Sequence, residues 1–167
     1  MSGLKETRKI GDVEARVVEE RETKDGRLVE VSRNFFAISG RTNGVFYFGE
    51  EVDIYKGGKL ASHDGAWLSG TNGARYGLMM PGLPLLGARY QQEIAPGVAM
   101  DRAEIVSMSE SVKTPACEFK DALKVAENTP LEFRIGREHK YYVREIGLVQ
   151  DGDLKLVRHG KDVASRD

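Results

Sequence analysis

The chain has 167 residues, of which 40% are apolar and 31% are charged, and its formal net charge is −1. These values are typical of a soluble globular protein that can bury a substantial core in one domain. The near-neutral charge removes the usual electrostatic basis for binding nucleic acid or an acidic membrane surface. No apolar run approaches the roughly 20 residues that span a bilayer, so we expect no transmembrane segment and no nucleic-acid partner.

The termini are charged, and residues 1–11 and 160–167 are expected to be loose tails of a single domain that covers residues 1–167. A charged-then-apolar leader does not open the chain, which favours a cytoplasmic location as expressed, or a mature domain whose export signal has been removed. Cys117 is the only cysteine, so neither an intrachain disulfide nor a multi-thiolate metal site is expected. The histidine spacing gives no zinc motif, and we predict neither a metal nor a cofactor.

Glycine turns separate segments that are rich in β-branched and aromatic residues. Tight hairpin turns need positive φ, and these dipeptides accept it, so each one predicts two antiparallel strands joined directly. The chain therefore reads as an all-β antiparallel meander with little helix, forming a closed or half-closed barrel. The four turns are Asp25-Gly26, Asn43-Gly44, Gly57-Gly58 and Asp151-Gly152.

The first strands are predicted from residue 13 to residue 68. The segment 27–38 has mixed parity at its end, which indicates either that both of its faces are covered or that it contains a bulge. Gly49 interrupts the apolar segment that begins at Val45, and a glycine inside a strand often marks a bend or bulge. Later strands are predicted at 88–95, 101–110, 119–128, 131–143 and 146–157.

Residues 69–87 break the strand pattern, because they combine five glycines and two prolines with an apolar core. A long loop this apolar is not expected to lie in water. We interpret it either as a lid across a barrel mouth or as a packed connection that closes one end of the core.

Titratable side chains give only weak catalytic candidates. Glu93 and Asp101 flank a predicted hairpin around Pro96-Gly97 and could do acid–base work inside a barrel, although solvated carboxylates on an outer face are commoner. His63 could act as a base, but its neighbour Asp64 points to the other face of a strand. Cys117 could form a thiol–imidazole–carboxylate group with Glu138 and His139, or it could simply be a small buried side chain.

The aromatic residues are the stronger indication of a site. They lie on several predicted strands, and a lipocalin-like barrel of ~8–10 strands can either fill its interior with such side chains or leave room for one small ligand. Substantial burial is expected for Trp67 and for most of Phe35, Phe46, Phe48 and Tyr141. The predicted ligand-binding residues, around a cavity near the 70–87 loop, are Trp67, Tyr76, Met79, Met80 and Tyr90.

The C-terminal half carries KTPACEFK at 113–120, TPLE at 129–132 and KYYVREIGLV at 140–149. Over residues 11–159 the chain resembles an uncharacterised group of bacterial exported proteins and lipoproteins. Their members share a TPxGxF turn followed by YYAPGxGLV, of which this chain keeps the form YYxxxxGLV, and they are similar to the open barrels of periplasmic lipoprotein carriers. The resemblance implies a β-barrel and an exported or periplasmic location, but no catalytic residues. The chain departs from the pattern at Cys117 and at 143–145, and the lone cysteine and remodelled turns would also fit an engineered member.

The sequence thus favours binding of a small apolar or amphipathic molecule in a β-barrel cavity. One alternative is a cofactor-independent enzyme, natural or engineered, that transfers protons with a pocket acid or base. Another is an envelope interaction module with a filled core. An ionisable group at the base of a cavity would favour the enzyme, and the absence of any cavity would favour the module. The ligand and the oligomeric state stay open.

Overall fold

The structure, a computed structural model, describes residues 1–131 and 137–160. The chain divides into two compact units. The first is built mainly from Met1–Pro84 and Tyr90–Arg102, and the second mainly from Ala103–Asn128 and residues 137–160. Every regular element in the described part of the chain is a strand, which confirms the all-β prediction.

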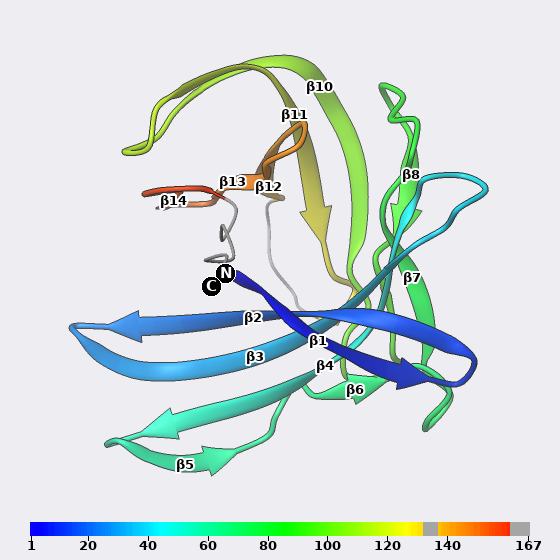
Figure 1. The fold of residues 1–167 in the computed structure, drawn as a ribbon, viewed down its shortest axis with the longest axis vertical. Helices are drawn as coiled ribbons and strands as arrows, with labels where there is room; N and C mark the ends of the chain where they lie inside the picture. Colours follow the sequence, from blue (N-terminus) through cyan, green and yellow to red (C-terminus); the bar gives the residue numbers. More distant parts are fainter. Residues whose placement is uncertain (132–136, 161–167) are drawn as a thin grey trace, which may run out of the picture. The chain divides into compact units, whose positions relative to one another are not determined.

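The first sheet has the order β1-β2-β3-β4-β7-β9, with β5 and β6 also paired to β4. All of its described pairings are antiparallel, as predicted. Figure 1 shows β2, β3 and β4 as long neighbouring strands, coloured blue to cyan. Its strands are β1 (Ser2–Ile10), β2 (Val13–Lys24), β3 (Arg27–Ile38), β4 (Val45–Lys56), β5 (Lys59–Ser62), β6 (Trp67–Leu68), β7 (Arg75–Met80) and β9 (Glu93–Ile94).

The second sheet has the order β14-β13-β12-β11-β10-β8. The YYxxxxGLV segment forms a hairpin in it, because β12 pairs antiparallel with β13. Its strands are β8 (Arg89–Gln91), β10 (Arg102–Lys113), β11 (Glu118–Asn128), β12 (Glu138–Val143), β13 (Gly147–Asp151) and β14 (Leu154–Lys155).

Two of the four predicted glycine turns lie where they were predicted. Asp25 and Gly26 have φ of 52° and 73° and join β2 directly to β3, as a two-residue hairpin with positive φ requires. Gly57 and Gly58 join β4 to β5 in the same way. The other two hairpins differ in detail. The 39–44 loop is longer than a two-residue turn, and the last turn is centred one residue later, at 152–153.

Three predictions about segment limits need correction. Residues 2–10 form β1, where a loose tail was expected, because β1 pairs with β2 and buries Ile10. The 69–87 segment is not a continuous loop, since it contains β7, which pairs with β4. The strand predicted at 131–143 is observed only at Glu138–Val143, and residues 132–136 lie outside the described residues, as do 161–167 of the predicted C-terminal tail.

The two faces of the first sheet carry separate apolar clusters. We call one side the Phe35 face, where Phe35 packs with Val17 and Phe48. We call the other the Tyr47 face, where Tyr47 packs with Trp67 and Ala74. The mixed parity at the end of 27–38 is explained by the covering of both faces, because the extra residue at the nearby β3–β4 register shift lies on β4 and not on this strand.

The predicted burial of aromatic residues is confirmed for most of the set. Phe35, Phe48 and Trp67 are buried, and Phe46 and Tyr141 are half-buried. The barrel is supported only in its coarser part. Among the described strands, β1 and β9 are the ends of the first sheet and β14 and β8 those of the second, and neither sheet closes on itself.

Candidate functional site

A β-bulge at Gly49 shapes the Tyr47 face. Phe36 pairs with Tyr47 and Asn34 with Glu50, so β4 has one residue more than β3 between these pairs. Gly49 takes up the extra residue with φ of 128°, a conformation that L side chains rarely adopt. A Cβ atom there would lie 2.3 Å from the carbonyl oxygen of Trp67. The bulge therefore depends on glycine, and it brings β6 against β4.

Four polar residues meet on the Tyr47 face, and we call Asn34, Tyr47, Glu50 and Trp67 the Glu50 cluster. Glu50 pairs with Asn34 on one side and with Trp67 on the other, and directly opposite residues share a face of a sheet. The Tyr47 hydroxyl donates to Asn34 Oδ1 at 2.5 Å. The Asn34 amide donates in turn to Ser32 Oγ at 3.1 Å and to the Val18 carbonyl at 3.3 Å.

The pKa of Glu50 lies near neutral pH. Burial raises the pKa of Glu50 from 4.5 to about 7. The hydrogen bond with Tyr47 lowers the pKa and the charge of Glu30 raises it, with smaller effects from Trp67 and Asp101. Trp67 Nε1 is buried without a hydrogen bond of ordinary geometry in the described structure, yet its N–H still favours the ionised carboxylate. Glu50 is therefore about half protonated at neutral pH.

The same environment acts on the phenol of Tyr47. Burial raises the pKa of Tyr47 well above 10, and the charges of Glu50 and Glu93 raise it further. Tyr47 therefore stays neutral, as a hydrogen-bond donor and acceptor, throughout the pH range in which Glu50 titrates.

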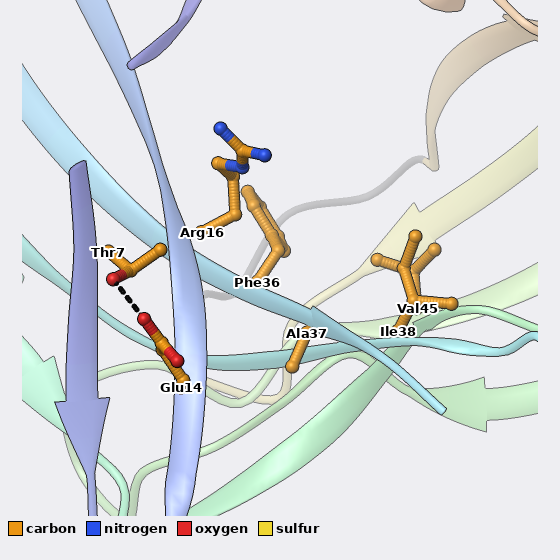
Figure 2. Close-up of a pocket in the computed structure, with 7 residues that line it drawn as sticks. All are labelled: Thr7, Glu14, Arg16, Phe36, Ala37, Ile38 and Val45. Atoms are coloured by element: carbon orange, nitrogen blue, oxygen red, sulfur yellow. Dashed lines mark hydrogen bonds between the residues drawn. The ribbon is translucent and has the colours of Figure 1, made fainter. Parts of the chain in front are cut away.

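An open groove of about 600 Å³ lies beside the Glu50 cluster in the first unit. Figure 2 shows Arg16, Phe36 and Val45 extending to one side of the strands, and the Thr7 hydroxyl bound to Glu14. This volume lies within the range of small-molecule pockets. The lining residues are Thr7, Glu14, Arg16, Phe36, Ala37, Ile38 and Val45.

Phe36 connects the groove to the Glu50 cluster. It lines the groove and stacks on the ring of Tyr47, with the two centroids 4.7 Å apart and the planes 20° apart. Arg16 pairs with Phe36 on the other side, and one of its N–H groups donates to the Leu4 carbonyl at 3.0 Å. Because a guanidinium carries five donors, Arg16 retains capacity for an acceptor in the groove.

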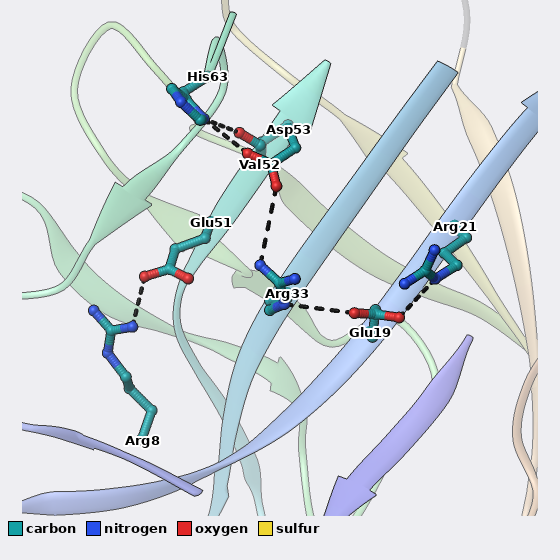
Figure 3. Close-up of polar contacts among 8 residues, drawn as sticks. All are labelled: Arg8, Glu19, Arg21, Arg33, Glu51, Val52, Asp53 and His63. Atoms are coloured by element: carbon teal, nitrogen blue, oxygen red, sulfur yellow. Dashed lines mark hydrogen bonds and ion pairs between the residues drawn. The ribbon is translucent and has the colours of Figure 1, made fainter. Parts of the chain in front are cut away.

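The Phe35 face carries a series of ion pairs. Figure 3 shows Arg33 between Glu19 and Asp53, with His63 reaching Asp53 from the other side. His63 Nδ1 lies 2.9 Å from Asp53 Oδ1 and equally far from the Val52 carbonyl, and its side chain is 64% exposed. Asp53, and not the neighbouring Asp64, is thus its carboxylate partner. This is a solvated strand surface, which gives little support to His63 as a catalytic base.

The structure brings two of the predicted catalytic candidates close to the cluster. Glu93 lies on β9, and its charge raises the pKa of Tyr47. The charge of Asp101 raises the pKa of Glu50. They belong to the expected hairpin, since the Gln92 amide donates to the Asp101 carbonyl and Ala95 bridges to Ala99. Neither lines the groove.

Cys117 does not meet the proposed partners. It is exposed in a turn where its amide donates to Thr114 Oγ1. His139 pairs with Ala126 on β11, nine residues further along, or about 30 Å at the rise of a strand. The thiol–imidazole–carboxylate hypothesis is therefore wrong for geometric reasons.

The predicted ligand-binding residues fall into different surroundings. Trp67 and Met79 belong to the apolar cluster of the Tyr47 face. Tyr76 is half exposed and stacks on Phe48, which belongs to the other face. Met80 pairs with Val45 at the rim of the groove, and Tyr90 is half-buried on β8. None of the five lines the groove itself.

Sequence reasoning missed the residues that the structure singles out, namely Arg16, Asn34, Tyr47 as a polar group and Glu50. The bulge signal at Gly49 was available, and a shift of one residue there places Tyr47 and Glu50 on the same face. Glu50 is half-buried, and this partial burial comes from β6 and from segments distant in sequence, so it leaves no local signal.

Comparisons with protein-family models, curated proteins and solved structures give no match. Within the described residues, no helix is long and apolar enough to cross a membrane. In the same part of the chain, no group of three His, Cys, Asp or Glu side chains is placed to hold a metal ion.

Proposed function

We propose that the protein binds a small amphipathic molecule in the groove of the first sheet, which acts as a half-closed barrel. The carrying observation is the groove's composition, in which an arginine stands beside the apolar side chains of Phe36, Ile38 and Val45. Apolar area removed from water there would contribute roughly 25 cal/mol per Å². Arg16 would hold an anionic head group, since its charged donors pair best with an anion.

The resemblance of the 140–149 segment to bacterial exported proteins supports an extracytoplasmic carrier role, which we include in the proposal. The ligand enters over Ile38, which is 70% exposed. The apolar residues near 83–86 belong to the 69–87 segment, which was interpreted either as a lid or as a packed connection, and they are not part of this site.

The test compares two probes with the same chain, octyl sulfate and 1-octanol, by isothermal titration calorimetry. Arg16→Gln should weaken octyl sulfate binding about fivefold and leave 1-octanol binding unchanged. Phe36→Ala should weaken both. Arg21→Gln is the matched control, because Arg21 lies on the same strand but is bound to Glu19 on the Phe35 face. If neither probe binds, or if Arg16→Gln and Phe36→Ala bind both as the wild type does, the proposal fails.

A second candidate function is proton transfer without a cofactor, and the pKa of Glu50 near 7 favours it, because a general base works best near the operating pH. Deprotonation of 5-nitrobenzisoxazole, a carbon acid, would report such a base. Turnover that Glu50→Gln abolishes, with a pH profile centred near neutrality, supports this function. Equal rates in the wild type and Glu50→Gln exclude it for this probe.

A further inference from the structure

The Glu50 cluster contains one proton that can move between two acceptors. The Tyr47 hydroxyl donates to Asn34 Oδ1 at 2.5 Å and also interacts with Glu50. A neutral Glu50 can donate to the Tyr47 oxygen and leave the Tyr47–Asn34 bond intact. An ionised Glu50 can only accept, so it draws the Tyr47 proton away from Asn34. The hydrogen bonds of Tyr47 therefore change when Glu50 titrates.

We call the set of Glu50, Tyr47 and Asn34 the relay. The charged groups around it are carboxylates from several elements. The charges of Glu30 on β3 and Asp101 ahead of β10 raise the pKa of Glu50. The charges of Glu93 on β9 and Glu20 on β2 raise the pKa of Tyr47. All of them disfavour further negative charge on the Tyr47 face. An anion that enters the groove adds to this repulsion.

The groove lies close enough to Glu50 and Tyr47 for their charge and hydrogen bonding to affect a ligand bound there. Phe36 stacks on Tyr47 and forms part of the groove wall. Arg16 pairs with Phe36, and Glu50 pairs with Asn34, which lies two residues before Phe36 on β3. These spacings put the Cα atoms of Arg16 and Glu50 about 12 Å apart. At this distance two charges inside a protein still interact measurably.

We infer that binding of an amphipathic anion in the groove is coupled to protonation of Glu50 through Tyr47 and Phe36. This inference rests on the proposed function, since it concerns the same groove. When Glu50 is neutral, Tyr47 stays hydrogen-bonded to Asn34, and the Tyr47 ring keeps Phe36 stacked against it. Neutral Glu50 also places no negative charge near the ligand. The anion therefore binds more tightly below neutral pH, and by linkage its binding promotes uptake of a proton.

The probe is octyl sulfate, which stays ionised throughout the titration, so that any pH dependence belongs to the protein. Titration calorimetry at pH values from about 5.5 to 8.5, around the range in which a perturbed carboxyl titrates, should show affinity falling about threefold to tenfold with rising pH. Near neutrality, buffers of different ionisation enthalpy should reveal uptake of a fraction of a proton on binding.

Glu50→Gln is the isosteric neutral variant. It should bind octyl sulfate without pH dependence or proton uptake, with the affinity that the wild type has at the lowest pH. Tyr47→Phe keeps the carboxyl but removes the relay hydroxyl, and should reduce the coupling. Glu51→Gln is the matched control, because Glu51 is the next residue on β4 but binds Arg8 on the other face, so it should keep the wild-type pH dependence.

The outcomes separate the two proposals. Binding that depends on Arg16 but is flat with pH overturns the coupling and leaves the proposed function standing. A pH dependence that persists in Glu50→Gln also overturns it, because another group, such as Glu30, would then be responsible. If octyl sulfate does not bind at any pH, the proposed function fails, and the coupling fails with it.

Discussion

Tyr47 and Glu50 are three positions apart on β4, yet their side chains lie on the same face of the sheet and each affects the pKa of the other. In a regular strand this spacing would place them on opposite faces. The bulge at Gly49 shifts the alternation by one residue. The local backbone at one glycine thus assembles the Glu50 cluster, and the first prediction concerns that glycine.

Gly49→Ala should destabilise the first unit by about 3 kcal/mol or more. The added methyl group would meet the Trp67 carbonyl oxygen at 2.3 Å, on a backbone with φ of 128°. Chemical denaturation followed by Trp67 fluorescence measures the loss. Gly3→Ala is the control, since a Cβ there meets no atom within 4 Å, and it should shift the midpoint only slightly. Equal midpoints for the two variants would show that the bulge adapts to a side chain.

Much of the fold could be predicted from local chemistry. Asp25-Gly26 and Gly57-Gly58 specify their hairpins because the turn geometry needs residues that accept positive φ. The pairing of β1 and the presence of β7 could not be predicted in this way. Their stability comes from neighbouring strands, against local sequences that are charged or rich in glycine.

The stability of the fold should depend on pH through Glu50. The folded pKa of about 7 lies above the ordinary value of 4.5, so the folded state holds a proton that the unfolded state releases first. Below about pH 4.5 both states are protonated and the effect is absent. As pH rises to 7 and above, the wild type loses up to about 3 kcal/mol.

Glu50→Gln removes this titration, so its stability relative to the wild type should increase from acid to neutral pH. Denaturant midpoints of both proteins at several pH values measure the difference. The sign is the decisive feature. No change of relative stability with pH would mean that Glu50 is well solvated and ionises freely, and a wild type that becomes relatively more stable with rising pH would mean that the fold lowers the pKa of Glu50.

The site was harder to predict than the fold for a physical reason. Glu93 and Asp101 were chosen as carboxylates on a hairpin, and they do act on the cluster. Glu50 was not singled out, because it follows the glycine that interrupts the apolar segment and stands beside a second carboxylate, Glu51. Its burial depends on Trp67 and on the bulge, which are properties of the folded sheet.

In the second unit, Lys140→Met should cost about 2–4 kcal/mol. Burial by itself lowers the pKa of Lys140, but the charge of Glu127, with Tyr142 and Asp151, outweighs burial and raises it. Lys140 Nζ lies 2.8 Å from Glu127 Oε2, whose side chain is 6% exposed. The double variant Glu127→Gln with Lys140→Met should recover part of the loss, because it leaves no buried carboxylate charge. A double variant whose loss equals the sum of the two single losses would show that the pair is not coupled.

Phe35 and Phe36 are adjacent in sequence but should have different roles, because they lie on opposite faces. Phe35 is 1% exposed in the cluster with Val17 and Phe48, and truncation to alanine should cost about 3–5 kcal/mol. Phe36 is half-buried and lines the groove, so Phe36→Ala should cost less stability but weaken octyl sulfate binding at a temperature where it is still folded. Denaturation midpoints and calorimetric titrations of both variants test this separation.

Phe35→Ala, measured under conditions in which it is folded, should bind the probe as the wild type does. If it loses binding as Phe36→Ala does, the groove is not confined to the Tyr47 face and the assignment of roles to the two faces is wrong.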